Sequence, residues 1–106
     1  MDNKTAMFLN YKKQIIRAID KSMDYLKSNP DRYSCSMLMY FLSTEAPTVQ
    51  REDVMHEYRK VCRARCERAG FRGYTHEQWF NKCQNDQQKI RIKKLEKLKK
   101  HFIDNY

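Results

Sequence analysis

The sequence predicts an all-α protein folded as a compact bundle of about four helices. Glycine and proline are scarce, with two of each in 106 residues, so few positions interrupt a helix. Between the interruptions, at Pro30, Pro47, Gly70 and Gly73, apolar residues recur every three or four positions, as on one face of a helix. No segment shows a convincing alternation of apolar and polar residues, the pattern of a half-buried strand. The length suits a single domain covering residues 1–106.

The first predicted helix covers residues 5–27. Lys13 and Arg17 fall on its polar side, and Ser28-Asn29-Pro30 ends it, because proline lacks the amide that would continue the helix. Its apolar stripe consists of Phe8, Tyr11, Ile15, Ile19, Met23 and Leu26.

The second predicted helix is short and covers residues 35–43, with Ser34 as a candidate cap. Its residues are nearly all apolar, so we expect it to be the most buried helix. A short apolar run also suits a buried strand, and that alternative stays open at this stage.

The third predicted helix covers residues 49–69. Thr48 follows Pro47 and can cap its start, and Gly70 suits the left-handed position that commonly closes a helix. Its apolar face consists of Val54, Met55, Tyr58, Val61, Cys62, Cys66 and Ala69.

The second and third helices together have the size and spacing of a helix-turn-helix. In such motifs the residues that open the second helix contact base edges, and here these would be Thr48, Gln50 and Arg51, of which Gln50 and Arg51 are suitable base readers. Glu52, Asp53 and Glu57 oppose this interpretation, because they lie on the same two turns and would repel phosphates. Plain packing of two helices in a bundle is the alternative.

The fourth predicted helix covers residues 76–103 and is long. Thr75 and Gln78 match a capping box, in which the two side chains reciprocally satisfy free amides. At 1.5 Å per residue, the helix would span about 42 Å, which exceeds the diameter of a domain of this size. Either it breaks near Asn85-Asp86, or its carboxyl half projects beyond the core.

This last helix places apolar and basic side chains on opposite faces, at 100° per residue. The apolar face gathers Phe80, Ile92, Leu95, Leu98 and Phe102, and Trp79 is expected to anchor the start of the helix to the core. A row of flexible ammonium groups on the other face suits a phosphate backbone. A solvated face and a basic membrane-surface or target-binding helix are alternatives, and the apolar seam could also form a homodimer. The basic face carries Lys89, Lys93, Lys97 and Lys100, with Lys94 beside them.

The net charge of +9 is concentrated toward the carboxyl end. Residues 1–50 hold seven Lys/Arg against five Asp/Glu, and residues 51–106 hold fifteen against eight. Such an excess attracts polyanions, so we expect a nucleic-acid partner, DNA rather than RNA, in a regulatory role. The alternative is a protein-interaction module or inhibitor, of the kind that viruses and phages encode, docking on an acidic or nucleic-acid-handling protein. Further candidate phosphate contacts are Arg59, Lys60, Arg63 and Arg72.

Four residues could form a zinc site, namely Cys62, Cys66, His76 and Cys83. Their spacing matches none of the common zinc-binding patterns, which favour two cysteines separated by two residues. Reduced thiols packed as small apolar groups are the favoured interpretation. No cofactor is predicted.

The sequence offers no recognisable catalytic motif. Two glycines cannot build a phosphate-cradling loop, and no nucleophile elbow occurs, so we predict a binding protein rather than an enzyme. No apolar run is long enough to span a membrane. Charged residues interrupt the first 25 positions, where a signal peptide would have its apolar core. We therefore expect an intracellular protein, in the cytoplasm, nucleus or nucleoid, that is not secreted.

Overall fold

The computed structural model describes residues 3–62 and 73–106, and within these ranges it is all-helical, with no strand. The prediction of an all-α bundle is confirmed. The helices are α1 (Asn3–Asn10), α2 (Lys12–Ser28), α3 (Ser34–Glu45), α4 (Arg51–Cys62), α5 (His76–Lys82), the π-helical segment η2 (Cys83–Gln87) and α6 (Gln88–Asn105).

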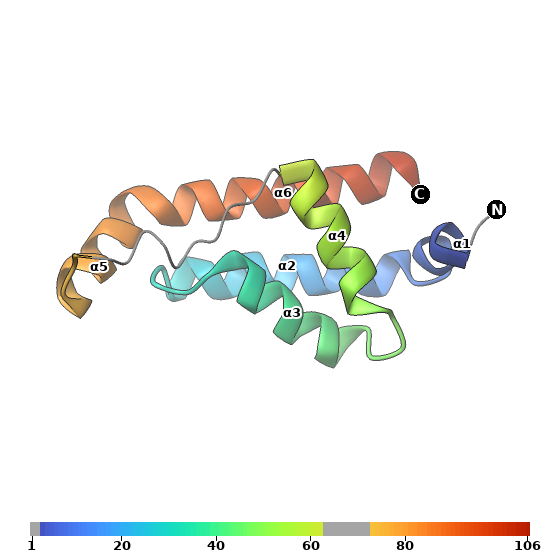
Figure 1. The fold of residues 1–106 in the computed structure, drawn as a ribbon, viewed down its shortest axis with the longest axis horizontal. Helices are drawn as coiled ribbons and strands as arrows, with labels where there is room; N and C mark the ends of the chain where they lie inside the picture. Colours follow the sequence, from blue (N-terminus) through green and yellow to red (C-terminus); the bar gives the residue numbers. More distant parts are fainter. Residues whose placement is uncertain (1–2, 63–72) are drawn as a thin grey trace.

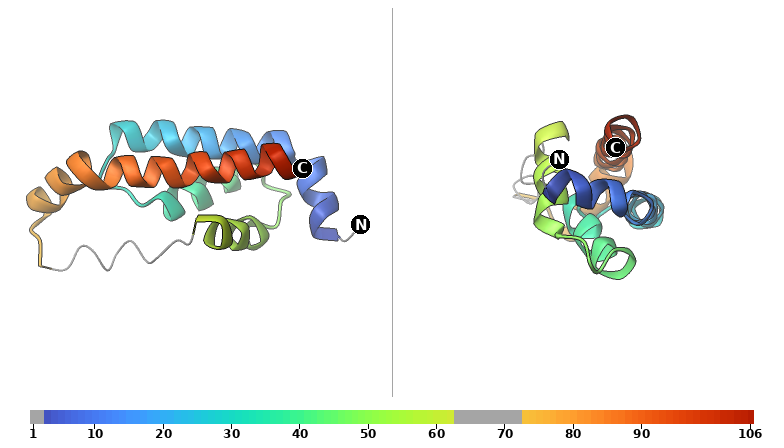
Figure 2. Two further views of the ribbon diagram at one scale, coloured as in Figure 1. Left: turned by 90° about the horizontal axis from the view of Figure 1, so that it is seen from above. Right: turned by 90° about the vertical axis from the view of Figure 1, so that its right-hand side faces the viewer.

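The long helices α2 and α6 run antiparallel, side by side, along a molecule of 48 × 22 × 20 Å (Figures 1 and 2). α3 packs against α2, and α4 crosses α6, so the described helices surround one core. Both termini lie at the same end of the molecule (Figure 1). The buried core consists of Phe8, Ile15, Ala18, Ile19, Leu26, Leu38, Leu42, Ala46, Val49, Val54, Met55, Tyr58, Leu95, Leu98 and Phe102.

The predicted helix 5–27 is wrong as one continuous element, because the structure divides it into α1 and α2 at Tyr11. Tyr11 has φ −112° and ψ 18°, which is not helical. The bend brings Phe8 of α1 onto the end of α6, where its ring lies 5.1 Å from the rings of both Phe102 and Tyr106 in edge-to-face contacts. These contacts join the two ends of the chain and account for the break.

The second predicted helix is confirmed as α3, but the expected burial on all sides is not found. Leu38 and Leu42 are fully buried, whereas the Tyr40 side chain is 59% exposed. α3 packs chiefly against α2 and lies at the edge of the bundle, so none of the described helices covers its opposite face (Figure 2).

The third predicted helix, 49–69, corresponds to α4. It begins two residues later than predicted, at Arg51, and residues 63–69 lie outside the described residues. Val54, Met55 and Tyr58 are buried on the predicted apolar face.

The long last helix is present, with a π-helical turn in place of the expected break at Asn85-Asp86. The expected projection occurs at the other end. α5 extends beyond the bundle, whereas the carboxyl half of α6 packs beside α2 (Figure 1). Gln88 fixes this arrangement, because its side-chain amide donates hydrogen bonds to the terminal carbonyls of Leu26 (2.6 Å) and Lys27 (2.9 Å).

The π-helical turn also exchanges two aromatic side chains. A π-helical turn contains one more residue than an α-helical turn. Residues before the turn therefore face the direction that an unbroken α-helix would give to the next residue in the sequence. Trp79 therefore occupies the buried face predicted for Phe80. Trp79 is buried, as expected for an anchor, and Phe80 is 40% exposed, so its predicted place in the core is wrong.

Candidate nucleic-acid interface

The structure places four lysines in one exposed row along α6, which we call the basic ridge: Lys89, Lys93, Lys97 and Lys100. Lysine is a good helix former, and spacings of four, four and three residues keep the row on one face. The row is about 16 Å long at 1.5 Å per residue. The opposite face is buried against the bundle and consists of Arg91, Leu95, Leu98 and Phe102.

No ion pair within the described part of the chain joins a lysine of the basic ridge to an acid. Lys99, on the flank of the same helix, differs, since its ammonium lies 2.8 Å from the Asp20 carboxylate of α2. Glu96 is the single acid in residues 88–100. The basic ridge therefore carries a local excess of positive charge.

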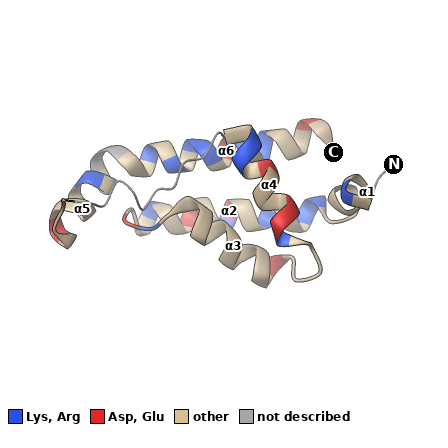
Figure 3. Cartoon of the chain, viewed as in Figure 1, with Lys and Arg blue, Asp and Glu red and all other residues tan. Residues whose placement is uncertain are grey.

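The last turn of α4 lies beside the middle of α6. The Cys62 thiol donates a hydrogen bond to the Lys94 carbonyl at 3.0 Å. Burial raises the pKa of this thiol above its ordinary value, against the opposing positive charges of Lys97 and Lys94. Basic residues on α6 and on the crossing end of α4 thus lie close together (Figure 3).

Two predicted phosphate contacts lie in the last turn of α4. Lys60 is exposed and makes no ion pair among the described residues. Arg59 is also exposed, but it lies 3.8 Å from Glu52 and is partly neutralised. Lys94 is half-buried and contributes its main chain to the contact between the two helices.

The predicted base-reading residues lie at the other end of α4. Gln50 and Arg51 are exposed, and the Arg51 guanidinium donates a hydrogen bond to the Ser43 hydroxyl at 2.6 Å. About 16 Å of helix separates them from the end that meets α6. α4 packs against α3 and, more extensively, against α6, and the hydroxyls of Ser34 on α3 and Tyr58 on α4 lie 2.7 Å apart. The structure does not bring these residues together with the basic ridge.

Glu57 was expected on the surface that would repel phosphates, and the structure places it in the interior instead. Its carboxylate lies 3.1 Å from Lys4 of α1 and 3.2 Å from the His101 ring of α6. Burial raises the pKa of Glu57, but the hydrogen bond from Lys4 and the positive charges of Lys4, His101 and Lys60 lower it by more. The pKa therefore lies below its ordinary value, and this acid does not face a ligand at the surface.

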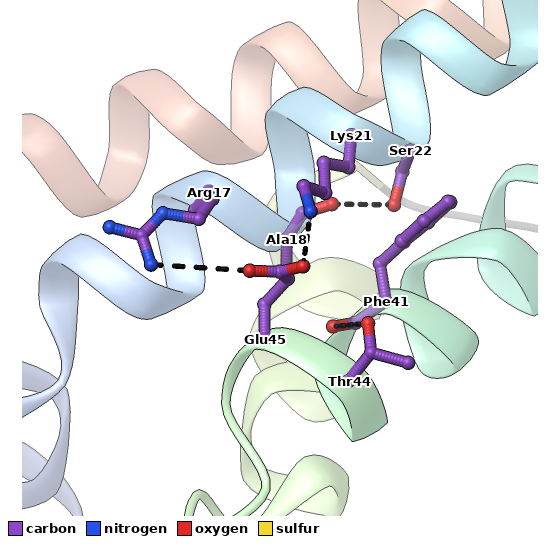
Figure 4. Close-up of polar contacts among 7 residues, drawn as sticks. All are labelled: Arg17, Ala18, Lys21, Ser22, Phe41, Thr44 and Glu45. Atoms are coloured by element: carbon purple, nitrogen blue, oxygen red, sulfur yellow. Dashed lines mark hydrogen bonds and ion pairs between the residues drawn. The ribbon is translucent and has the colours of Figure 1, made fainter.

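Several basic side chains of α2 make polar contacts with other helices. Glu45 of α3 pairs with Lys21 and lies 4.0 Å from Arg17, which joins α2 to α3 (Figure 4). Lys12 donates a hydrogen bond to the Ile103 carbonyl at 3.2 Å, which joins α2 to α6. The contrast with the basic ridge is clear, because the ridge lysines have no comparable partner in the described ranges.

Arg91 is a site that the sequence reasoning missed. Its side chain is 1% exposed, and one guanidinium nitrogen donates to the main-chain carbonyls of Arg32 (2.9 Å) and Pro30 (3.2 Å). The guanidinium lies over the rings of Tyr33 (5.3 Å) and Trp79 (5.5 Å). The sequence does indicate this burial, because Arg91 lies four residues before Leu95 and seven before Leu98, and this spacing places it on the apolar face.

The candidate zinc residues do not converge. Cys62 contacts the carbonyl of Lys94, whereas Cys83 lies eleven residues earlier in the same helical rod, roughly 16 Å away. That separation exceeds the reach of two ligands on one zinc ion. His76 is exposed at the start of α5. Cys66 lies outside the described residues, as do the predicted phosphate contacts Arg63 and Arg72.

The apolar seam proposed for a homodimer is occupied within the monomer, because Leu95, Leu98 and Phe102 are fully buried in the core. Apolar surface is exposed elsewhere. A shallow cavity of about 160 Å³ lies between α2 and α3, and its lining is aromatic and thioether: Tyr25, Met37, Tyr40 and Phe41.

Comparison of the chain with models of known protein families, with curated proteins and with solved structures finds no match. Within the described residues, no helix is both long and apolar enough to traverse a bilayer.

Proposed function

We propose that this protein binds DNA in a regulatory role, and that the basic ridge on α6 holds the phosphates. The observation that carries the proposal is the row of four exposed lysines without acidic partners among the described residues. Lys60, in the last turn of α4, is a further exposed lysine that could add to this surface. Ammonium groups on flexible stems bind phosphates without demanding exact geometry. They supply affinity and salt sensitivity rather than choice of sequence.

A salt titration of binding to duplex DNA tests the proposal. Four phosphate contacts give a slope of log affinity against log salt of about −3.6, at about −0.9 per contact. Affinity should then fall roughly 150-fold between 50 and 200 mM salt. Replacing all four ridge lysines by glutamine should weaken binding and remove most of that slope. Unchanged binding in this variant would refute the assignment of the ridge.

A pair of double variants separates position from net charge. Lys93→Gln with Lys97→Gln removes two charges from the basic ridge, and Lys13→Gln with Lys27→Gln removes two from exposed positions on α2. The ridge pair should reduce the magnitude of the slope by about 1.8, and the α2 pair should leave it unchanged. Equal losses in the two double variants would show that only the total charge matters.

A protein partner is the second candidate function, and the cavity between α2 and α3 favours it. Tyr40 and Tyr25 expose much of their rings there, and tyrosine, phenylalanine and methionine are enriched in protein interfaces. A partner presenting one large apolar side chain would fit this cavity. Its capture should survive nuclease treatment, be lost in Tyr40→Ala and persist in the four-lysine ridge variant. Capture that persists in Tyr40→Ala but is lost in the four-lysine variant would show that the partner binds the basic ridge instead.

A further inference from the structure

Within the described residues, the part of α6 that carries the basic ridge has no aromatic ring on which an unpaired base could stack. Residues 88–100 read QKIRIKKLEKLKK and contain no aromatic side chain. On the adjoining end of α4, Tyr58 is buried, and the neighbouring exposed side chains are those of Arg59 and Lys60. His101 follows the ridge directly, but its ring nitrogen lies 3.2 Å from the buried carboxylate of Glu57. Among the described residues, the basic ridge therefore offers charge without an aromatic platform.

The exposed aromatic rings of the described residues lie on other parts of the molecule. Tyr25 and Tyr40 belong to α2 and α3 and line the cavity between these two helices. Tyr74 and Phe80 lie at or near α5, before the π-helical turn that rotates the face of the helix. None of these four rings shares the lysine row of α6.

The two forms of DNA make different demands on a protein surface. Proteins that hold single strands combine a charged groove with aromatic side chains on which successive bases stack. A duplex keeps its bases paired and presents a rigid outer surface with one negative charge per about 1.7 Å of its axis. The basic ridge supplies charges at intervals of about 6, 6 and 4.5 Å, and residues 88–100 supply no aromatic side chain beside them.

We infer that the basic ridge selects double-stranded over single-stranded DNA, through backbone contacts alone; this inference rests on the proposed function. The ligand class is the duplex backbone, and the preference arises because the ridge gives flexible strands no stacking platform. The salt slope should be about −3.6 for a duplex, against about −2.8 for a single strand that met the same four lysines.

Fluorescence anisotropy with a labelled 20-base-pair duplex and each of its separate strands tests the preference, using the full chain at 50 mM salt. We expect the duplex to bind at least tenfold more tightly than either strand. Equal or tighter binding of the single strands would overturn the inference while leaving DNA binding intact. Binding of neither form would refute the proposed function, and the duplex preference with it.

A gain-of-function variant tests the cause of the preference. Ile90 is 47% exposed beside Lys89, so Ile90→Trp places a stacking ring on the ridge without removing charge. We expect single-strand affinity to rise about tenfold and duplex affinity to stay within twofold. Leu9→Trp, at an exposed position on α1, is the matched control and should change neither. An unchanged single-strand affinity in Ile90→Trp would contradict the inference, because stacking would then not set the preference.

Discussion

One buried carboxylate connects three helices, and its removal should destabilise the fold measurably. Glu57 of α4 is 5% exposed and contacts Lys4 of α1 and His101 of α6 at 3.1 and 3.2 Å. A hydrogen bond to a charged group contributes about 1.5–3 kcal/mol. Lys4 keeps some access to water and recovers part of its hydration, so we expect Glu57→Gln to cost about 2 kcal/mol at pH 7. For a domain of this size, the melting temperature should fall by roughly 10 °C.

The cost of Glu57→Gln should depend on pH in a defined direction. The pKa of Glu57 in the folded protein lies below its ordinary value of 4.5, because its positive neighbours outweigh the effect of burial. A lowered folded-state pKa means that the carboxylate stabilises the fold fully above the unfolded-state pKa. This stabilisation is lost as the pH falls through the folded-state pKa. The stabilities of the two proteins should therefore begin to converge as the pH falls below about 4.5.

Urea denaturation followed by circular dichroism, repeated from pH 7 to pH 3, measures this difference in unfolding free energy. Glu52→Gln is the matched control, because Glu52 is exposed and lies 3.8 Å from its partner Arg59. It should change the unfolding free energy by less than about 0.5 kcal/mol. A difference between wild type and Glu57→Gln that stays constant down to pH 3 would refute the linkage argument. A Glu57→Gln protein as stable as wild type would refute the structural role itself.

Three further outcomes follow from other contacts. Arg91→Lys should lower the unfolding free energy by about 2 kcal/mol in urea denaturation, because an ammonium cannot reproduce both carbonyl bonds and the stacking on two rings; an unchanged midpoint would contradict this. Thr75→Ala removes the capping box and should cost about 1 kcal/mol, seen as faster hydrogen exchange at the Gln78 amide, and equal exchange rates would argue against the cap. Cys62 should be alkylated by iodoacetamide at pH 8 more slowly than free cysteine, and more slowly still in Lys97→Gln, because that lysine lowers the thiol pKa. Mass spectrometry of the alkylated peptide measures both rates, and a faster reaction in Lys97→Gln would contradict the placement of α4 beside the ridge.

The features predicted correctly from the sequence are those set by neighbours a few residues away. The capping box at Thr75 and Gln78 forms as expected, because both partners lie within one helical turn. The exposure of the basic ridge also follows from local spacing, since lysines opposite an apolar stripe must face away from the core. The same spacing predicts that Arg91 is buried, because it lies four residues before Leu95 on the apolar face. Its charge argued for an exposed position instead.

The features that were missed depend on contacts between distant segments. From the sequence, Glu57 is expected at the surface. It is buried because Lys4 and His101, 53 and 44 positions away in the sequence, contact its carboxylate. No feature of the sequence that we identified predicts the π-helical turn. This turn determines that Trp79, and not Phe80, is buried. Which acids neutralise which lysines is likewise a property of the assembled bundle, as the pairing of residues 20 and 99 shows.

The distribution of paired and unpaired cations is the strongest argument that the basic ridge has a ligand. An ordinary solvated helix face mixes acids among its lysines, and pairs at i, i+4 then stabilise it. The cations of this protein that face other helices, such as Lys4, Lys21 and Lys99, do have acidic partners. The ridge lysines instead repel one another at spacings of three and four residues, with Glu96 the single acid in residues 88–100, and this repulsion costs stability. A bound polyanion would relieve the repulsion, and the salt titration measures that relief directly.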